Sequence, residues 1–232
     1  MIFTKDDFPN GPPNQVILML SGGLDSAILF YIICKHFPKT YIVPFSGDDA
    51  CNPADILCAY DILKFIRKRF PDANIGKHET YRFDTNDTFW FNKAKDQFDN
   101  FTFSSIGGLS KYFQLMAALK KVREQNNILT FVNAVTANPP NEEMNLHGLQ
   151  NGADQYRNVC IEPRLSKTIY GNVLYKPWIN TTKRDIAKIY KQENLMESLY
   201  KLTKSCIDPT ATYEKRECGL CWWCREKKWG FE

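Results

Sequence analysis

The residues best suited to chemistry form a short run, Ser-Gly-Gly-Leu-Asp-Ser, at positions 21–26. Two adjacent glycines let a backbone approach a ligand without a Cβ atom in the way. The apolar run at 16–20 before this segment, and the helical spacing of apolar residues after it, predict a buried strand that turns directly into a helix. Unpaired N–H groups and the positive end of the helix dipole favour an anion at such a place. The segment 21–26, hereafter the glycine loop, is therefore predicted to bind an anion.

Asp25 limits which anion the glycine loop can bind. The loop has neither the GxxxxGK(S/T) pattern of a P-loop nor the GxGxxG pattern of a dinucleotide fold. A carboxylate beside a phosphate is repulsive unless a cation bridges the two, so Asp25 predicts Mg²⁺ between itself and phosphate oxygens. The hydroxyl groups of Ser21 and Ser26 can add hydrogen bonds. The alternative is an ordinary strand–helix turn in which Asp25 only caps the helix.

The glycine loop resembles the PP-loop motif of the ATP pyrophosphatase (alpha-hydrolase) superfamily. Enzymes of that superfamily grip the β,γ-pyrophosphate of ATP and leave the α-phosphorus open to attack. The resemblance implies ATP and Mg²⁺ as ligands and Asp25 and Ser26 as catalytic residues, with Lys183 as a further candidate that assists at a phosphate. The implied nucleotide-binding residues come from the loop and the ends of two strands: Leu20, Ser21, Gly22, Gly23, Leu24, Asp25, Ser26, Phe45 and Ser46.

A second chemical group lies near the end of the chain, where four cysteines have the spacing C-x11-C-x2-C-x2-C. Four thiolates match a tetrahedral structural Zn²⁺ site, and the short spacings let a tight turn present successive sulfurs to one ion. Such a site has no open position, so the ion would hold structure and would not activate water. An Fe–S cluster or a redox pair are the alternatives. The predicted metal ligands are Cys206, Cys218, Cys221 and Cys224.

The other cysteines and the histidines give weaker signals. Cys34 and Cys58 fall in predicted helices and are expected in the core. Cys51 and Cys160 fall in predicted loops, where either can serve as a nucleophile, although no partner histidine is evident. The three histidines, His36, His78 and His147, are expected to be incidental.

Composition fits a globular chain of moderate size. The sequence has 232 residues, 44% of them hydrophobic, and a net charge of +4, which permits an anionic small substrate without demanding a nucleic acid. No apolar run is long enough to cross a membrane, and the polar, proline-rich start is unlike a signal peptide. We therefore expect a cytoplasmic protein whose cysteines are thiols or metal ligands.

Strand and helix signals alternate along the chain. Strands are expected at 16–20, 41–45, within 74–83, at 128–132 and at 173–175, and helices after the glycine loop, at 53–70, at 110–124 and from Thr182 onward. This order predicts an α/β fold with a doubly wound, mostly parallel sheet. Residues 136–166 are expected to form a loop system that faces the substrate. The predicted organisation is a flexible lead-in at 1–14, an ATP-binding domain at 15–200 and a four-cysteine segment at 201–232 packed on it.

Both ends of the chain together resemble the 7-cyano-7-deazaguanine synthase family. That family pairs an N-terminal PP-loop with a C-terminal four-cysteine zinc knot that ends in a basic residue and a Gly/Ala-Phe pair. Here Arg225, Gly230 and Phe231 follow the cysteines in those places. The stretches 175–179 and 182–186 are similar to the family's segment between its last strand and the following helix.

The resemblance implies a ligase that forms AMP and pyrophosphate. The carboxylate of 7-carboxy-7-deazaguanine would attack the α-phosphate of ATP, ammonia would displace AMP to give an amide, and a second activation would give the nitrile 7-cyano-7-deazaguanine. The implied cofactors are ATP, Mg²⁺ and Zn²⁺. The implied partners are small molecules, with a homodimer allowed, no membrane, and a nucleic acid possible in principle but not favoured.

The chain departs from the family pattern in its middle. Phe45-Ser46-Gly47-Asp48 stands where the family has an aromatic-Gly-Gln stretch, and the segment 108–111 lacks the family's Arg-Asn pair. Two other readings therefore stay open. One is a different PP-loop adenylating enzyme, such as a tRNA or nucleobase thiolase or an amidating enzyme. The other is a nucleotide-binding module without catalysis.

Overall fold

The computed structural model describes residues 2–49, 53–84, 89, 92, 103–149, 164–167, 173–208 and 217–232. The described strands form one six-stranded sheet in the order β3-β2-β1-β4-β6-β5. All neighbouring strands are parallel except β5 and β6, which pair antiparallel at the edge. The strands are β1 (Gln15–Met19), β2 (Tyr41–Asp48), β3 (Glu79–Arg82), β4 (Thr130–Val132), β5 (Leu165–Lys167) and β6 (Val173–Tyr175). The predicted α/β fold with a mostly parallel sheet is confirmed.

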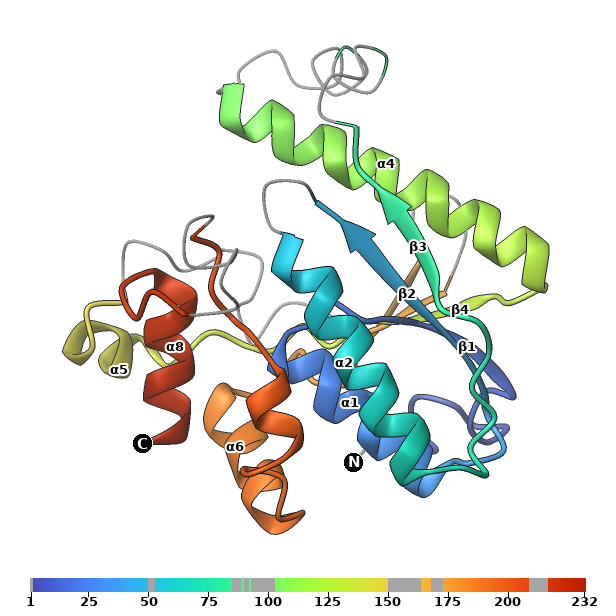
Figure 1. The fold of residues 1–232 in the computed structure, drawn as a ribbon, viewed down its shortest axis with the longest axis horizontal. Coiled ribbons are helices and arrows are strands. Elements are labelled where there is room, and N and C mark those ends of the chain that lie inside the picture. The colour runs from blue at the N-terminus through green and yellow to red at the C-terminus, as the bar shows by residue number, and fades with distance from the viewer. Residues whose placement is uncertain are drawn as a thin grey trace.

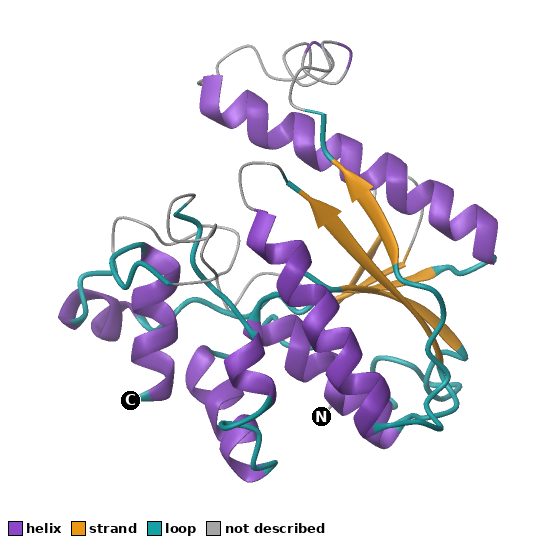
Figure 2. Ribbon diagram, viewed as in Figure 1, coloured by secondary structure: helices purple, strands orange, loops and turns teal. Residues whose placement is uncertain are grey.

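Helices cover both faces of this sheet, as Figures 1 and 2 show. Residues of β1, β2 and β4 that point to one face pack in one core with α1, α2 and α6, and those that point to the other face pack with α4. Strands buried on both faces read as continuous apolar runs, which is why 16–20 lacks alternation. The described helices are α1 (Leu24–His36), α2 (Pro53–Arg69), α4 (Phe103–Asn126), α5 (Asn141–Leu146), α6 (Lys183–Gln192) and α8 (Trp222–Phe231), with a 3₁₀ turn η3 (Leu199–Leu202).

The topology places the glycine loop at the point where the strand order reverses. From β1 the chain moves to β2 and β3 on one side of the sheet, and β4 and β6 lie on the other side. In open α/β sheets, ligands bind outside the carboxyl ends of the strands at this switch point. The residues that directly follow β1 are Leu20 and the glycine loop.

Some elements differ from the sequence-based expectation. α4 begins at Phe103, seven residues before the predicted start at 110, and the buried Ser110 hydroxyl accepts a hydrogen bond from Gln114 inside this helix. The predicted loop 136–166 contains α5 and the first residues of β5, which are too short to show a period. α8 was not predicted either, because its sequence was interpreted only through its cysteines.

The first residues of the chain make specific contacts. Phe3 stacks on Tyr175 of β6, and Phe8 meets the same ring edge-on. The Tyr175 hydroxyl donates to Asp7 at 2.9 Å and accepts the Phe3 N–H at 2.9 Å. Phe3 is therefore part of the core and Phe8 packs against it, within the segment predicted to be a flexible lead-in; the flexibility stays a prediction.

Among the described helices, none combines the length and the apolar character needed to cross a membrane.

Candidate functional site

The glycine loop has a backbone that only glycine tolerates. Gly22 has φ +78°, and a Cβ atom added there would lie 2.3 Å from the carbonyl oxygen of Asp55 in α2. Gly23 is the N-cap of α1, and its N–H donates to Ser21 Oγ at 3.4 Å. The close approach of α2 and the positive φ therefore explain Gly22, whereas Gly23, with φ −82°, has a backbone that other residues also adopt.

Two serines hold the loop in shape. The buried Ser26 hydroxyl accepts the Ser21 N–H at 3.2 Å and donates to the Gly23 carbonyl at 3.1 Å. The hydroxyl groups of Ser21 and Ser26 lie 3.2 Å apart, and Ser21 is exposed. Ser26 thus ties the two ends of the turn together, and Ser21 faces outward.

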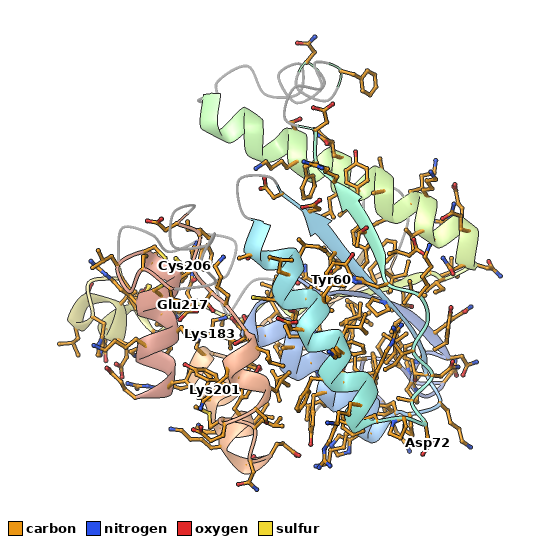
Figure 3. The ribbon with its side chains drawn as sticks, viewed as in Figure 1. Tyr60, Asp72, Lys183, Lys201, Cys206 and Glu217 are labelled. Carbon is orange, nitrogen blue, oxygen red and sulfur yellow. The ribbon has the colours of Figure 1, made fainter. Side chains whose placement is uncertain are left out.

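Asp25 lies in the first turn of α1 and forms an ion pair with Lys183, the first residue of α6. One carboxylate oxygen, Oδ2, accepts a hydrogen bond from the Lys183 ammonium. The other, Oδ1, is buried and accepts no hydrogen bond from any residue in the described part of the chain. Lys183 is 6% exposed, and its position is visible in Figure 3.

A second contact fixes α6 at the start of α1. The Tyr190 hydroxyl, fully buried, donates to the Leu24 carbonyl at 2.8 Å. Burial raises the pKa of Tyr190 well above its ordinary value, so this hydroxyl remains a donor. Tyr190 and Lys183 together attach α6 to the helix end that carries the glycine loop.

Oxygen atoms are the ligands that Mg²⁺ prefers. A buried carboxylate oxygen without a hydrogen-bond donor is suited to a cation, because its desolvation is otherwise uncompensated. Asp25 Oδ1 meets this description beside a turn whose N–H groups suit phosphate. The residues present therefore fit Mg²⁺ at Asp25.

The side chains of the other predicted nucleotide-binding residues are buried. Leu20 and Phe45 are 1% and 2% exposed, and the Leu20 N–H donates to the Phe45 carbonyl at 2.7 Å. The Ser46 hydroxyl donates to the Leu20 carbonyl at 2.6 Å. Contacts from these three residues to a ligand would therefore come from their backbone.

His78, which was expected to be incidental, contacts this group of residues. Its Nε2 lies 2.8 Å from Ser46 Oγ, and its ring packs edge-on against Tyr60 of α2. Burial lowers the pKa of His78 to about 4, with Arg67 adding to the effect. Because the Ser46 hydroxyl hydrogen goes to Leu20, His78 must donate from Nε2, and the lowered pKa keeps its ring neutral at pH 7.

A partly buried ion pair lies next to the loop, where Lys204 Nζ is 3.3 Å from Asp55 Oδ1. The Lys204 side chain is 1% exposed, and its backbone N–H donates to the Gly22 carbonyl at 3.1 Å. Burial raises the pKa of Asp55 to about 6, against the opposing effect of the Lys204 ammonium. Sequence reasoning missed this pair, since nothing in the spacing of residues 55 and 204 connects them.

The four predicted metal ligands come together. The sulfurs of Cys206, Cys218, Cys221 and Cys224 all lie within 4.8 Å of one another, and those of Cys218 and Cys224 are 4.0 Å apart. A tetrahedral zinc site with bonds of about 2.3 Å requires sulfur separations of roughly 3.8 Å. The cluster can therefore hold a metal ion.

Backbone N–H groups point at two of these sulfurs. Cys206 Sγ accepts from Asp208 and Cys218 at 3.4 and 3.3 Å, and Cys218 Sγ accepts from Leu220 and Cys221 at 3.4 and 3.3 Å. The last two donors lower the pKa of Cys218 to about 7. Such donors favour thiolates, the form that binds metal.

The cysteine segment packs on α6 through α8, and the two helices lie side by side in Figure 1. A Cβ atom at Gly230 would lie 2.5 Å from the Cβ atom of Lys183, so the two helices touch at the residue that pairs with Asp25. Glu143 of α5 adds a second link, because it accepts both Arg184 Nη1 at 2.8 Å and Trp229 Nε1 at 3.1 Å.

The four cysteines outside the cluster fall into two groups. Cys34 and Cys58 are buried in the core, as predicted. Cys51 and Cys160, the two possible nucleophiles, lie outside the described residues.

No protein-family profile matches the chain, and no curated protein matches it. Several solved structures resemble it in fold. An NH3-dependent NAD synthetase from Campylobacter jejuni is 19% identical, with a TM-score of 0.48 over 85% of this chain and 71% of that one. An NMN synthetase from Francisella tularensis is 14% identical, with a TM-score of 0.49 over 97% and 87%. A U34-tRNA thiolase from Methanococcus maripaludis is 12% identical, with a TM-score of 0.49 over 98% and 73%.

Proposed function

We propose that this chain is a PP-loop ATP-dependent ligase that releases AMP and pyrophosphate. The single observation that carries the proposal is the state of Asp25, whose Oδ2 pairs with Lys183 while Oδ1 is buried without a hydrogen-bond donor among the described residues. A carboxylate so placed beside an anion-binding turn is suited to a site for a metal-bound polyphosphate.

Within this proposal, the glycine loop binds the β,γ-pyrophosphate of ATP. The N–H groups of the loop and the N-terminus of α1 stabilise the charge that develops on the departing pyrophosphate. Asp25 would hold Mg²⁺, which when bound neutralises charge on phosphate oxygens. Lys183, kept at the loop by Asp25 and by the contact with Gly230, is available to a phosphate oxygen.

The proposed acceptor is the carboxylate of 7-carboxy-7-deazaguanine. One carboxylate oxygen bonds to the α-phosphorus of ATP as the bond to pyrophosphate breaks. Ammonia then attacks the acyl carbon, AMP leaves with the activated oxygen, and a proton is lost to give the amide. A second molecule of ATP activates the amide oxygen in the same way, with release of pyrophosphate, and loss of AMP and of both protons on the amide nitrogen gives the nitrile. The support for this acceptor is the resemblance at residues 175–179, at 182–186 and at the cysteine segment.

We assign Zn²⁺ to the four-cysteine cluster as a structural ion. Four thiol ligands leave no open coordination position for water or substrate. The ion would fix the segment from Cys206 to Cys224 and, through α8, the position of Lys183.

The experiment that tests the function uses the full chain with ATP, Mg²⁺, ammonium and 7-carboxy-7-deazaguanine, with mass spectrometry of the products. We expect 7-cyano-7-deazaguanine together with AMP. Asp25→Asn should abolish the product, while Asp72→Asn, which removes an exposed carboxylate far from Lys183 in Figure 3, should leave it unchanged. AMP without the nitrile would refute the acceptor and leave the adenylation reaction standing. No nucleotide turnover with any carboxylate or amide acceptor would refute the ligase proposal.

A further inference from the structure

Lys204 contacts the glycine loop and lies two residues before Cys206, the first cysteine of the four-cysteine cluster. Its backbone N–H donates to the Gly22 carbonyl at 3.1 Å, and its own carbonyl oxygen lies 3.5 Å from the place where a Cβ atom of Gly23 would be. Both glycines of the loop therefore rest against the backbone of one residue from near the end of the chain.

The side chain of Lys204 reaches the loop by a second route. Its ammonium lies 3.3 Å from the Asp55 carboxylate, and the backbone carbonyl of Asp55 is the atom that faces Gly22 most closely. Lys204 is 1% exposed at its side chain, so the ammonium is held inside the protein. Gly22 thus has backbone contacts with both Lys204 and Asp55.

The cysteine cluster begins two residues after Lys204. Cys206 is 1% exposed, and its sulfur accepts N–H groups from Asp208 and Cys218. Between them, the Ser205 N–H donates to Glu217 Oε1 at 2.8 Å, and the same oxygen accepts Lys227 Nζ of α8 at 2.9 Å. Cys206 and Glu217 lie close together in Figure 3. The segment 204–206 is therefore fixed at one end by the cluster and at the other by the glycine loop.

We propose that Lys204 is a positioning residue that couples metal occupancy of the four-cysteine cluster to the conformation of the glycine loop, and so to its affinity for a nucleoside triphosphate. The nucleotide part of this inference rests on the proposed function. Metal bound at Cys206 fixes the backbone that supports Gly22 and Gly23. Loss of the metal releases that backbone, and a displaced loop no longer presents its N–H groups to the phosphates.

The first test needs no nucleotide. Hydrogen exchange is measured by mass spectrometry on a peptide covering residues 20–27, in the metal-loaded protein and after removal of the metal with a chelator. We expect amide exchange in this peptide to become about tenfold faster without metal and to slow again when zinc is restored. Peptides from α4, on the far face of the sheet, should change much less. Equal exchange at residues 20–27 with and without metal would overturn the proposal.

The second test uses variants with a matched control. Lys204→Met removes the buried ammonium and keeps most of the stem, Lys204→Arg retains a cation, and Lys201→Met removes an exposed lysine three positions earlier, paired only on the surface with Glu197. We expect Lys204→Met to weaken binding of ATP with Mg²⁺ by about tenfold or more, Lys204→Arg to recover part of it, and Lys201→Met to resemble the parent chain. Bound metal should remain one ion per chain in all three.

The role of Lys204 in the coupling is measured by comparing the effect of metal removal on ATP binding in the parent chain and in Lys204→Met. In the parent chain, metal removal should raise the dissociation constant for ATP by about tenfold, whereas in Lys204→Met it should raise the constant by less than about threefold. The same increase in both proteins would overturn the role of Lys204. If Lys204→Met does not fold, the hydrogen-exchange experiment on the parent chain decides whether metal binding and the glycine loop are coupled. If the parent chain binds no ATP, the proposed function fails, and the exchange experiment still tests the coupling by itself.

Discussion

Asp25 and Lys183 are 158 positions apart in the sequence and form an ion pair at the start of two helices, α1 and α6. Both side chains are largely withdrawn from solvent, with 19% and 8% of their surface exposed. The pair places a carboxylate and an ammonium together at the first turn of α1, where the glycine loop meets the helix. It is the feature on which the proposed phosphate chemistry depends.

The first prediction separates stability from activity at this pair. Asp25→Asn leaves the buried Lys183 ammonium without its carboxylate, which should lower the free energy of unfolding by about 3 kcal/mol. Adding Lys183→Met removes the isolated charge and should recover at least half of the loss, while pyrophosphate release stays absent. Urea unfolding and a pyrophosphate assay on the single and double variants measure both. A double variant that regains activity would contradict the role of Asp25.

The second prediction concerns Gly22. Gly22→Ala should lower the free energy of unfolding by about 3 kcal/mol, because it combines a positive φ with a Cβ atom placed 2.3 Å from the Asp55 carbonyl. Gly11→Ala is the matched control: its φ is +93°, but nothing lies within 4 Å of the added atom, so it should lose only about 1 kcal/mol. Equal losses in urea unfolding would show that α2 does not press on the loop.

The third prediction uses the pH dependence of stability. The pKa of His78 is lowered by burial to about 4, below the ordinary value of 6.5, so the unfolded chain binds a proton more readily than the folded one. The stabilisation is complete above pH 6.5 and should be lost as the pH falls toward 4, by roughly 2 kcal/mol after allowance for solvent screening.

His78→Gln keeps a donor for the Ser46 hydroxyl and removes the titrating ring, so the loss of unfolding free energy that His78 causes between pH 6.5 and 4 should be absent from the variant. His36→Gln, at an exposed histidine, is the control that should keep the slope of the parent chain. An unchanged slope in His78→Gln would place the titration at another group whose pKa is lowered by folding. Asp55 is not such a group, because its raised pKa acts in the opposite direction over the same range.

The fourth prediction concerns the cysteine cluster. Cys221→Ser should lose the bound metal and lower the melting temperature by about 10 °C, because metal binding contributes directly to folding of this segment. Cys34→Ala, at a buried cysteine of α1 outside the cluster, should keep one ion per chain. Elemental analysis and thermal unfolding measure both. A parent chain purified without zinc or iron would exclude the site, and iron with sulfide would replace zinc by a cluster.

The sequence predicts those parts of the molecule whose residues lie close together along the chain. The apolar run of β1, the two glycines and the apolar face of α1 lie within one continuous stretch, and the structure keeps them in that order. The four cysteines were predicted from spacing alone, since short loops constrain where the sulfurs can go. The helix expected from Thr182 onward is α6, and at its start the Asp185 carboxylate accepts the Thr182 N–H at 3.2 Å.

The parts that were missed depend on contacts between distant segments. β5 has three residues and exists through its pairing with β6, from Leu165 with Tyr175 to Lys167 with Val173. His78 is a lone histidine in the sequence and gains its role only when β3 brings it beside Ser46. Lys204 likewise has no motif of its own, and its importance follows from the backbone that it places against Gly22.

The central claim is that the glycine loop and Asp25 hold the pyrophosphate end of ATP so that the α-phosphorus is attacked. The most direct test is chromatography coupled to mass spectrometry of the nucleotide products after incubation with ATP, Mg²⁺, ammonium and 7-carboxy-7-deazaguanine labelled with oxygen-18 in its carboxylate. The account predicts AMP that carries oxygen-18 from the carboxylate, with pyrophosphate in equal amount, and none of these products from Asp25→Asn. Formation of ADP and inorganic phosphate would contradict it.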